Sequence, residues 1–461
     1  MSVDRRQFLG TLGSMAAAAA LQRVALGAKS EGRKPNIVFI IGDDLGRADL
    51  GCYGSKQVKT PNIDRLATEG MCFTEAYSGC TVCAPARSVL MTGYHMGHTS
   101  VRSNPGGVPI LAEDMTVAQV LKQAGYACGG FGKWGLGDVQ TTGVPEKHGF
   151  DVFFGYYHQV HAHDYYPSYL WRNSEKVTLS GNQDGKRQQY SHYLIFEQMQ
   201  KFLRENKDRP FFCYAPWTPP HGKYEIPSDE PTWQIYKDKP WPDNAKVVAA
   251  MTSMVDRHVG EVSALLKEMN LDDRTIVFFT SDNGAPNRFE GLLDSCGPLR
   301  GNKGNLYEGG IRVPMIVRWP GKIKAGTVSD HIWYFTDVME TLAELAGTKP
   351  AKGGDGISVV PTLLGENIVG RKQERHDCLY WEYGPEKRFM QAVRMGNWKA
   401  VRPKPDAPLE LYDLSKDIGE KDNVAAQHPE VVAKIEACLK TCRTEPRPQI
   451  EPDKPPGQRY R

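Results

Sequence analysis

Two apolar stretches of the chain each end in a pair of oxygen-bearing side chains. Residues 35–44 read PNIVFIIGDD and stop at Asp43 and Asp44. Residues 272–284 read DDRTIVFFTSDNG and repeat the pattern, with Asp282 and Asn283 after the run. Short continuous apolar runs are typical of strands buried on both faces of a sheet. Because ligands of open α/β sheets gather outside the carboxyl ends of the strands, the pattern predicts an oxygen-rich cation site at one sheet edge.

Helical patterns alternate with further strand candidates. Thr116 is placed to cap a helix that ends at Gly125, and two longer amphipathic patterns follow later in the chain. The alternation of strands and helices predicts an α/β sandwich. The longer helical patterns cover residues 244–270 and 336–347, and the additional strand candidates cover residues 211–215 and 313–319.

The length of 461 residues and a change of character near Gly365 predict two domains. After that point, β-type segments separated by turn-rich stretches precede one closing helical pattern. We therefore expect a main domain over residues 35–365 and a small α+β domain with an antiparallel sheet over residues 370–445. A Pro-rich tail covers residues 446–461.

The first 28 residues resemble an export signal. Arg5 and Arg6 precede a short, alanine-rich apolar run that ends at Leu21. This run is too short to span a bilayer stably, and small residues follow it as a cleavage site. The twin arginines followed by Gln-Phe-Leu resemble a Tat signal, with an ordinary secretory leader as the alternative. We expect residues 1–28 to direct the folded protein through the Tat translocase to the periplasm or outside of a bacterial cell, with no membrane span in the mature chain.

The net charge and the number of cysteines limit the kinds of partner and of scaffold that this protein can have. The formal net charge is +3, and the expected leader carries Arg5, Arg6 and Arg23 against Asp4, so the mature chain keeps +1. A chain this close to neutral has no general basic surface, so a nucleic-acid partner is not supported. The ten cysteines are too sparse for a disulfide scaffold.

Residues 80–88 read CTVCAPARS and hold two cysteines in a C-x-x-C spacing. Such a pair is compatible with a disulfide, half of a metal site or a redox motif. The two cysteines differ in the residues on their C-terminal side. Cys83 has Pro85 two residues on and Arg87 four residues on, whereas Cys80 has valine and alanine at those positions.

The segment from Cys83 to Arg87 matches the C-x-P-x-R signature of the type I sulfatases, the formylglycine-dependent, arylsulfatase-like branch of the alkaline-phosphatase-like superfamily. The stretches GDDLG, MTGYHMGH, GFGKWGLG, PPHGKY, SDNGAP and LRGNKGNLYEGGIRVP also resemble sulfatase motifs, in the family's order. The resemblance implies an alkaline-phosphatase-like sandwich: a large mixed central sheet flanked by helices, plus a small C-terminal α+β domain. It implies hydrolysis of sulfuric esters by the domain over residues 35–365.

The resemblance implies that Cys83 is oxidised to Cα-formylglycine by a formylglycine-generating or equivalent maturase. One hydroxyl of the aldehyde hydrate would attack sulfur and displace the alcohol. The second would then lose its proton, which eliminates sulfate and restores the aldehyde. The residues after Cys83 have a helical pattern, and a helix N-terminus favours an anion.

The resemblance also implies metal ligands. Asp43, Asp44, Asp282 and Asn283 would bind the cation, with the hydrate at Cys83 and a substrate oxygen completing the shell. An all-oxygen set with three carboxylates favours Ca²⁺, with Mg²⁺ second. The alternative is that these side chains merely cap strand ends and loops.

Four further residues take catalytic roles by resemblance. Arg87 would hold the formylglycine hydroxyl, and Lys133 and Lys303 would clamp the sulfate oxygens. His221 would be the general acid for the leaving oxygen, assisted by Lys303. A lone histidine or lysine is usually solvated, so these assignments depend on the motif context.

One position departs from the family. Sulfatases commonly read G-K-W-H-L-G where this chain has Gly135 in place of the histidine that helps to deprotonate the second hydroxyl. Residues 153–171 are rich in aromatics and histidines, which is compatible with a packed segment beside the core or with a wall of the substrate cleft. His161 and His163 in this segment are the weak candidates for the missing base.

Two other functions compete with a sulfatase. A phosphatase or phosphodiesterase on the same fold would use a Ser or Thr nucleophile and a histidine-rich two-metal site. A non-catalytic carbohydrate-binding relative would be expected to have lost Cys83 or the ligands. Neither pattern matches this chain, and family analogy points to a sulfated polysaccharide, or a sugar released from one, as the substrate.

Overall fold

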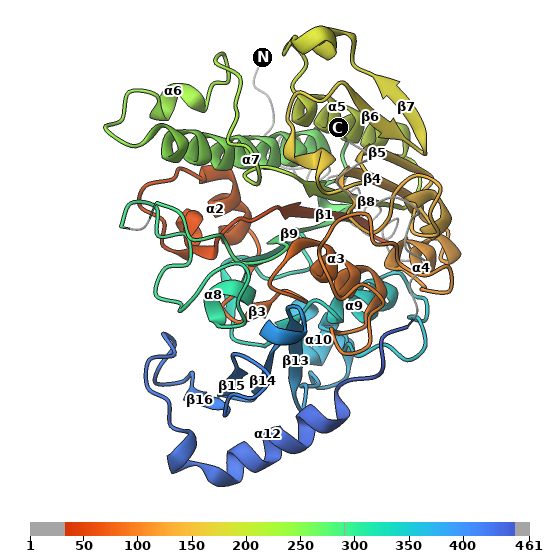
Figure 1. Ribbon diagram of the computed structural model, residues 1–461. Coiled ribbons are helices and arrows are strands. Elements are labelled where there is room, and N and C mark those ends of the chain that lie inside the picture. The colour runs from red at the N-terminus through yellow and green to blue at the C-terminus, as the bar shows by residue number, and fades with distance from the viewer. Residues whose placement is uncertain (1–32, 290, 448–461) are drawn as a thin grey trace, which may run out of the picture.

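The computed structural model describes residues 33–289 and 291–447. A ten-stranded sheet runs through the larger part of the molecule in the order β11-β2-β10-β9-β1-β8-β4-β5-β6-β7 (Figure 1). Its strands are β1 (Asn36–Gly42), β2 (Met71–Phe73), β4 (Ala127–Lys133), β5 (Val152–Tyr156), β6 (Tyr169–Arg172), β7 (Glu175–Thr178), β8 (Phe211–Trp217), β9 (Thr275–Ser281), β10 (Met315–Arg318) and β11 (Thr327–Ser329).

The middle of the sheet is parallel and its flanks are mixed. Strand β1 pairs in parallel with β8 on one side and with β9 on the other, so that Ile37 lies opposite both Phe212 and Ile276. All seven residues of β1 are buried, as expected for a strand covered on both faces. Strand β10 runs antiparallel to β9, and β6 runs antiparallel to β5. The predicted α/β sandwich with a large mixed sheet is therefore confirmed.

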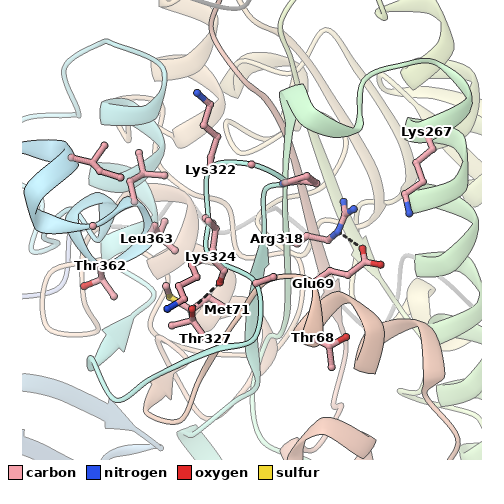
Figure 2. Close-up of a pocket in the computed structure, with 17 residues that line it drawn as sticks. Thr68, Glu69, Met71, Lys267, Arg318, Lys322, Lys324, Thr327, Thr362 and Leu363 are labelled. Atoms are coloured by element: carbon pink, nitrogen blue, oxygen red, sulfur yellow. Dashed lines mark hydrogen bonds and ion pairs between the residues drawn. The ribbon is translucent and has the colours of Figure 1, made fainter. Parts of the chain in front are cut away.

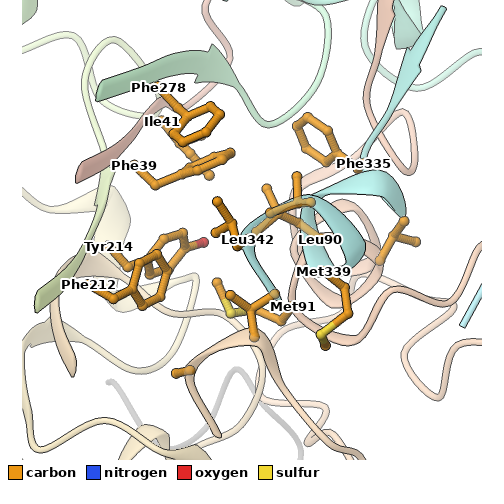
Figure 3. Packing of buried hydrophobic residues seen from close by; sticks show 14 of the residues in the cluster. Phe39, Ile41, Leu90, Met91, Phe212, Tyr214, Phe278, Phe335, Met339 and Leu342 are labelled. Carbon is orange, nitrogen blue, oxygen red and sulfur yellow. The ribbon is translucent and has the colours of Figure 1, made fainter. Parts of the chain in front are cut away.

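Helices cover both faces of this sheet (Figure 1). On one face, Phe39 and Ile41 of β1 point toward Leu90 and Met339 (Figure 3). Alternate residues of β1, including Val38, point to the opposite core. The first face packs against α3 (Cys83–Thr92), α4 (Val117–Gln123) and α9 (Asp337–Leu345), and the second against α2 (Pro61–Thr68), α5 (Ser191–Glu205) and α7 (Asp243–Glu268).

Helix α4 shows how local sequence sets a boundary. The side chain of Thr116 accepts a hydrogen bond from the backbone N–H of Gln119, and the side chain of Gln119 accepts one from the backbone N–H of Thr116. This capping box satisfies two otherwise unpaired donors at the helix start. Gly125 follows the helix with φ +84°, a left-handed conformation that glycine adopts without strain.

The C-terminal part forms a second, antiparallel sheet below the main one (Figure 1). Its strands are β13 (Leu379–Tyr383), β14 (Met390–Met395), β15 (Trp398–Arg402) and β16 (Glu410–Asp413), and α12 (Pro429–Thr441) closes it. Trp381 of β13 packs against Tyr77 and Leu306 of the main part. Shorter elements are β3 (Ala76–Tyr77) paired with β12 (Trp333–Tyr334), α6 (Trp233–Tyr236), α8 (Glu308–Ile311), α10 (Val360–Leu364) and α11 (Glu366–Val369).

Two predicted segments lie outside the described residues: the Tat-type leader over residues 1–28 and the tail from residue 448 onward. The start of the tail is described. Thr444 donates its backbone N–H to the carbonyl of Gly97 at 3.1 Å, and Arg447 pairs with Asp114 at 2.5 Å. Within residues 33–289 and 291–447, no helix is long and apolar enough to cross a membrane.

Candidate active site

The carboxyl ends of β1 and β9 bring four side chains together, as the strand pattern predicts. Asp43 and Asp44 follow β1, Asp282 and Asn283 follow β9, and the two strands end in register at Gly42 and Ser281. All four side chains are buried. Asp44 has φ +60°, an uncommon conformation for a residue other than glycine. Such strained backbone positions cluster at functional sites.

Hydrogen bonds fix the relative positions of this group. The backbone N–H of Asp44 donates to Oδ1 of Asp282 at 3.2 Å, and Nδ2 of Asn283 donates to Oδ1 of Asp44 at 2.7 Å. The other end of the Asn283 amide is different, because its buried Oδ1 has no hydrogen-bond partner among the described residues. A buried, unpaired amide oxygen beside carboxylates is a feature that a cation would satisfy.

Cys83 lies beside these carboxylates at the first residue of α3. Its Sγ is 3.3 Å from Oδ1 of Asp43 and 3.4 Å from Nζ of Lys303, and only 1% of the residue is exposed. Cys80 is also a free thiol, but its Sγ faces the backbone carbonyl of Glu382 at 3.9 Å. Of the two cysteines in the C-x-x-C pair, the structure therefore places Cys83 beside the buried aspartates.

Three cations surround the carboxylates. Arg87 donates to Oδ2 of Asp282 from two nitrogens, at 2.9 and 3.2 Å, and also lies 3.3 Å from Asp43. Lys133, the last residue of β4, is 2.6 Å from Asp43, and Lys303 is 2.6 Å from Asp44. Three carboxylates and three cations thus share one buried volume, and their formal charges cancel before any ligand is bound.

His221 completes the group of predicted residues at the centre. Its Nε2 lies 3.5 Å from Oδ2 of Asp44, while its buried Nδ1 has no hydrogen-bond partner among the described residues. The ring of His163 stacks on the ring of His221, with centroids 4.5 Å apart and planes inclined by 30°. His163 is therefore one ring removed from the carboxylates.

The other weak histidine candidate has a different environment. The His161 ring packs edge-on against Tyr156 at 5.0 Å between centroids and lies 4.4 Å from the ring of Tyr169. The charged groups that act most on it are Asp164, His158 and Lys176 rather than the central carboxylates. His161 and His163 are two residues apart in a 3₁₀ turn, so their side chains take different directions, and only His163 reaches the centre.

Burial and charge set the protonation of the centre. Burial tends to raise the pKa of Asp43, but the positive charges of Lys133, Arg87 and Lys303 outweigh it and hold that pKa well below its usual range. Burial, reinforced by Asp43, raises the pKa of Asp282 to about 6. Burial and Asp43 also raise the pKa of the Cys83 thiol, so the unmodified thiol is protonated at neutral pH.

Burial also decides the state of the two stacked histidines. It lowers the pKa of His221 to about 3 and that of His163 to about 4, because the charged imidazolium loses its hydration. Both rings are therefore neutral at physiological pH, and each has one N–H donor and one acceptor nitrogen.

Comparison with known proteins identifies the family to which this chain belongs. A sequence profile of the sulfatase family matches residues 35–348, and the profile "N-sulphoglucosamine sulphohydrolase, C-terminal" matches residues 302–445. The chain is 33% identical to arylsulfatase A of Homo sapiens over 87% of this chain and 86% of that protein. This chain belongs to the sulfatase family. It is a sulfuric ester hydrolase, and the competing phosphatase and binding-protein interpretations are not supported.

Two further proteins match this chain over a similar share of its length. The chain is 29% identical to N-acetylgalactosamine-6-O-sulfatase of Bacteroides thetaiotaomicron over 89% of this chain and 94% of that protein. The solved structure of Ps i-CgsB in complex with k-i-k-neocarrahexaose superimposes with a TM-score of 0.77 at 28% identity, over 90% of this chain and 94% of that chain. The large mixed sheet and the C-terminal antiparallel sheet are thus family features.

The glycine that departs from the sulfatase pattern has a specific neighbour. Gly135 has φ +79°, and a Cβ atom at this position would lie 3.3 Å from Cγ of Gln159 and 3.7 Å from Cδ of Arg87. Gln159 is buried and donates from Nε2 to Oδ1 of Asn104 at 2.7 Å, and that oxygen also accepts the N–H of Ala84 at the start of α3. Sequence reasoning missed Gln159 and Asn104, because no motif includes them.

The residues present fit an oxygen-loving divalent cation. The donor set is three carboxylates and one amide, all hard oxygen ligands of the type that Ca²⁺ and Mg²⁺ prefer. The unpaired Oδ1 of Asn283 beside the three carboxylates is the observation that indicates a cation site. His221 lies in the same cluster of possible ligand atoms, within 4.8 Å of Asp43, Asp44 and Cys83.

A separate hollow lies at the opposite edge of the sheet and does not share this chemistry. A pocket of about 950 Å³ opens beside Arg318 and Lys324 (Figure 2). Arg318 stands near the start of β9, because β10 is antiparallel to it, so the pocket lies at the amino ends of the parallel strands. The guanidinium of Arg318 forms ion pairs with Glu69 at 2.8 Å and with Asp272 at 2.6 Å. Arg318 of this pocket is therefore held by carboxylates, and the pocket is separate from the active site of this sulfatase.

Proposed function

We propose that this sulfatase removes sulfate from a sulfated carbohydrate, using a formylglycine made from Cys83 and a bound divalent cation. The observation that carries the proposal is the position of Cys83, whose Sγ contacts both Asp43 and Lys303 inside the buried charged centre. The cation would be held by Asp43, Asp44, Asp282 and Asn283, with Ca²⁺ preferred and Mg²⁺ second.

The reactive groups and the chain's own residues have separate tasks. A formylglycine hydrate would supply the nucleophilic oxygen and the second hydroxyl needed to release sulfate, and a cation held by the four ligands would polarise the sulfate oxygens. The chain's own residues position these events. Arg87 lies between Asp282 and Asp43 and one turn of α3 beyond Cys83, where it can hold the hydroxyl that replaces the thiol.

The charge balance of the centre suits a sulfate ester. Three carboxylates and three cations cancel, so a divalent cation would give the pocket a net charge of about +2, which attracts an anion. Lys133 and Lys303 are compact point charges, suited to sulfate oxygens that carry growing charge in the transition state. Nζ of Lys303 also lies 3.4 Å from Sγ of Cys83, so this charge is close to the sulfate whichever of its oxygens it contacts.

His221 is proposed as the acid that protonates the leaving alcohol oxygen. Because its ring is neutral without substrate, it would take up this proton when the anionic ester binds. Its Nε2 is near Asp44, and Lys303 contacts the same carboxylate at 2.6 Å, so both can serve one leaving group. His221→Ala is expected to slow the first step, most strongly for alcohols that leave poorly.

We further propose that His163 supplies the base that the sulfatase pattern places at position 135. General-base help of this kind is typically worth about 10²–10⁴-fold in rate. His163→Ala should therefore release alcohol in a burst and accumulate a covalent sulfate adduct, seen by mass spectrometry of the quenched enzyme. His161→Ala is the matched control. If both variants release sulfate at the unaltered rate, the proposal is wrong, and the base is water or a residue other than these two histidines.

Sulfated carbohydrate is proposed because of the relatives. One is named for N-acetylgalactosamine-6-O-sulfate chemistry, and one solved structure contains k-i-k-neocarrahexaose. A panel of sulfated oligosaccharides, assayed for sulfate release beside a simple aryl sulfate, tests this proposal. If the enzyme hydrolyses the aryl sulfate but none of the oligosaccharides, the carbohydrate assignment is contradicted and the sulfatase chemistry is unaffected.

The deciding experiment on the mechanism is mass spectrometry of the peptide that holds both cysteines. Conversion of thiol to aldehyde lowers the mass by about 18 Da, which we expect at Cys83 and not at Cys80. Cys83→Ala should abolish turnover with the fold intact, and Cys80→Ala is the matched control. Active protein from its natural host with an unmodified Cys83 would refute the mechanism.

Export is part of the same proposal. The Tat-type leader, residues 1–28, would carry an already folded enzyme to the periplasm or the cell exterior, so the maturase would act on Cys83 in the cytoplasm. Replacing Arg5 and Arg6 with lysine should keep active enzyme in the cytoplasm, and export that is unaffected would favour an ordinary secretory leader.

A further inference from the structure

Three cysteines gather where α12 meets β13, outside the active site. Cys378 precedes β13, while Cys438 and Cys442 lie one turn apart at the end of α12. The Sγ atoms of Cys438 and Cys442 are 3.1 Å apart, those of Cys378 and Cys442 are 4.0 Å apart, and all three sulfurs lie within 4.8 Å of one another. We propose that these three thiols, as thiolates, bind a thiophilic metal ion, namely Zn²⁺.

The helical spacing argues against a disulfide within α12. The N–H of Cys442 donates to the carbonyl of Cys438 at 3.0 Å, so the backbone is still helical at this point. Side chains four residues apart on a helix have Cβ atoms about 5–6 Å apart. A disulfide needs a Cβ separation of about 3.5–4.5 Å, so this pair cannot close without unwinding the helix.

A metal ion uses all three sulfurs, whereas a disulfide leaves one of them over. Zinc–sulfur bonds are about 2.3 Å, which places thiolates of a tetrahedral site roughly 3.8 Å apart. The separations of 3.1 and 4.0 Å lie on either side of that value. Ligands at i and i+4 of a helix are also a recurrent metal-binding arrangement, and all-thiolate sets select soft ions.

The surroundings leave the fourth ligand position to water or a small ligand. The two histidines that act on Cys378 are engaged elsewhere. His95 accepts the N–H of Gly97 at its Nδ1 at 3.0 Å and faces Asp355 with its Nε2 at 3.8 Å. His376 is held by Asp337 at 2.7 Å. All three cysteines are partly exposed, so an ion can enter. A Cβ atom at Gly97 would lie 1.8 Å from the carbonyl oxygen of Cys442, so the site abuts the loop after α3. A bound ion would thus fix the end of α12 to β13 beside the main domain.

The first test uses the full-length protein without substitution. Protein stripped of metal under reducing conditions is incubated with ZnCl₂ alone and then alkylated, and the labelled peptides are identified by mass spectrometry. Zinc should protect Cys378, Cys438 and Cys442 from alkylation. Cys52 and Cys72, which contact each other without a third thiol, should react equally with and without zinc.

The second test measures the bound ion. Replacing zinc with Co²⁺ should give a thiolate-to-cobalt charge-transfer band, and Cys438→Ser or Cys378→Ser should remove that band and most of the bound zinc. Cys72→Ser is the matched control and should leave both unchanged. A disulfide that joins Cys378 to Cys442 in protein from the natural host, or equal alkylation with and without zinc, would overturn the proposal. Neither outcome affects the sulfatase mechanism, because none of these cysteines is assigned to it.

Discussion

Two buried clusters of charge occupy this molecule, and both combine carboxylates with lysine and arginine side chains. The catalytic centre holds three carboxylates and three cations. The interface cluster lies between the main domain and the C-terminal sheet and consists of Glu308, Glu420, Lys399, Arg312 and Arg394. Lys399 joins the two glutamates at 3.1 and 3.3 Å. Burial is nearly complete in both clusters.

The clusters differ in how their hydrogen-bonding capacity is used. Glu308 accepts from Tyr77 at 2.6 Å, Arg312 at 3.1 Å and Lys399 at 3.1 Å, and Glu420 accepts the N–H of Glu308 at 2.7 Å. In the catalytic centre, by contrast, Oδ1 of Asn283 and Nδ1 of His221 have no partner among the described residues. A buried ionic cluster that satisfies itself serves structure, and one that leaves polar atoms unpaired is prepared for ligands.

Metal removal is the test that should distinguish the two clusters most clearly, because of the two only the catalytic centre is expected to bind a metal ion. Chelation is expected to reduce sulfate release to background, and Ca²⁺ or Mg²⁺ should restore it, because three carboxylates at the centre need a cation. Asp282→Asn should cause a loss that added metal does not reverse, and Asp413→Asn, on the C-terminal sheet, is the control. Full activity of the metal-free protein, or restoration by Zn²⁺ alone, would contradict the oxygen-ligand assignment.

Lys399→Met should damage stability rather than chemistry. The substitution leaves Glu308 and Glu420 close together and buried without their shared cation, which typically costs about 3–5 kcal/mol. Urea unfolding measures this loss in the free energy of unfolding. Lys416→Met, at a side chain that is 83% exposed, should change it by less than about 0.5 kcal/mol. Activity per folded molecule should persist, and a parallel loss of rate would show that the interface cluster takes part in catalysis.

Lys303→Met should show the opposite pattern. Loss of one preorganised charge at a transition state typically lowers the rate by about 10²–10³-fold, or about 2.7–4 kcal/mol. With Ca²⁺ present, the free energy of unfolding should change little, because Asp44 keeps Asn283 and the cation as partners. Steady-state sulfate release and urea unfolding, run on the same preparation, test both parts. A loss of several kcal/mol in stability would make Lys303 a structural residue like Lys399.

The smallest expected effect concerns a pair of histidines in the core. His192 and His258 are buried and hydrogen-bonded to each other at 2.9 Å, and burial lowers the pKa of His192 to about 3. The unfolded chain takes up protons near pH 6.5 while this folded pair does not. Stability is therefore full above about pH 6.5 and falls as the pH decreases, by roughly 1 kcal/mol per histidine between pH 7 and 5.5.

Urea unfolding at the two pH values measures this fall in stability. The double variant His192→Phe/His258→Leu should have a flatter pH dependence, and the variant His428→Gln, at a partly exposed histidine, should keep the slope. An unchanged slope in the double variant would assign the pH dependence to other groups.

The sequence predicts the parts of the site that depend on local pattern and sheet geometry. Asp43 and Asp282 each end an apolar run, and parallel neighbouring strands must deliver them to one edge. The fold class follows from the same runs and from the alternation with helices. The roles assigned to Cys83, Arg87 and the lysines come from motif resemblance and remain predictions.

Features that depend on long-range packing could not be predicted. His161 and His163 are equivalent in the sequence, and the turn geometry alone sends one toward His221 and the other toward Tyr156. The interface cluster joins Lys399 to Glu308, 91 residues away, and no local pattern marks either residue. Gln159 likewise comes to lie beside Gly135 only after β4, β5 and the following turn have assembled.

The central position of β1 has a consequence for the order of assembly. This strand is made first, but its partners β8 and β9 begin at residues 211 and 275. At about 5–20 residues per second, the ribosome needs roughly 10–35 s to deliver the first partner. An unpaired strand with a run of five apolar residues, 37–41, is an aggregation hazard during that interval, and charges that flank such a run act as gatekeepers. Arg33 and Lys34 stand before β1, and Asp43 and Asp44 stand after it, so the residues proposed to bind the cation in the finished enzyme also guard the nascent strand.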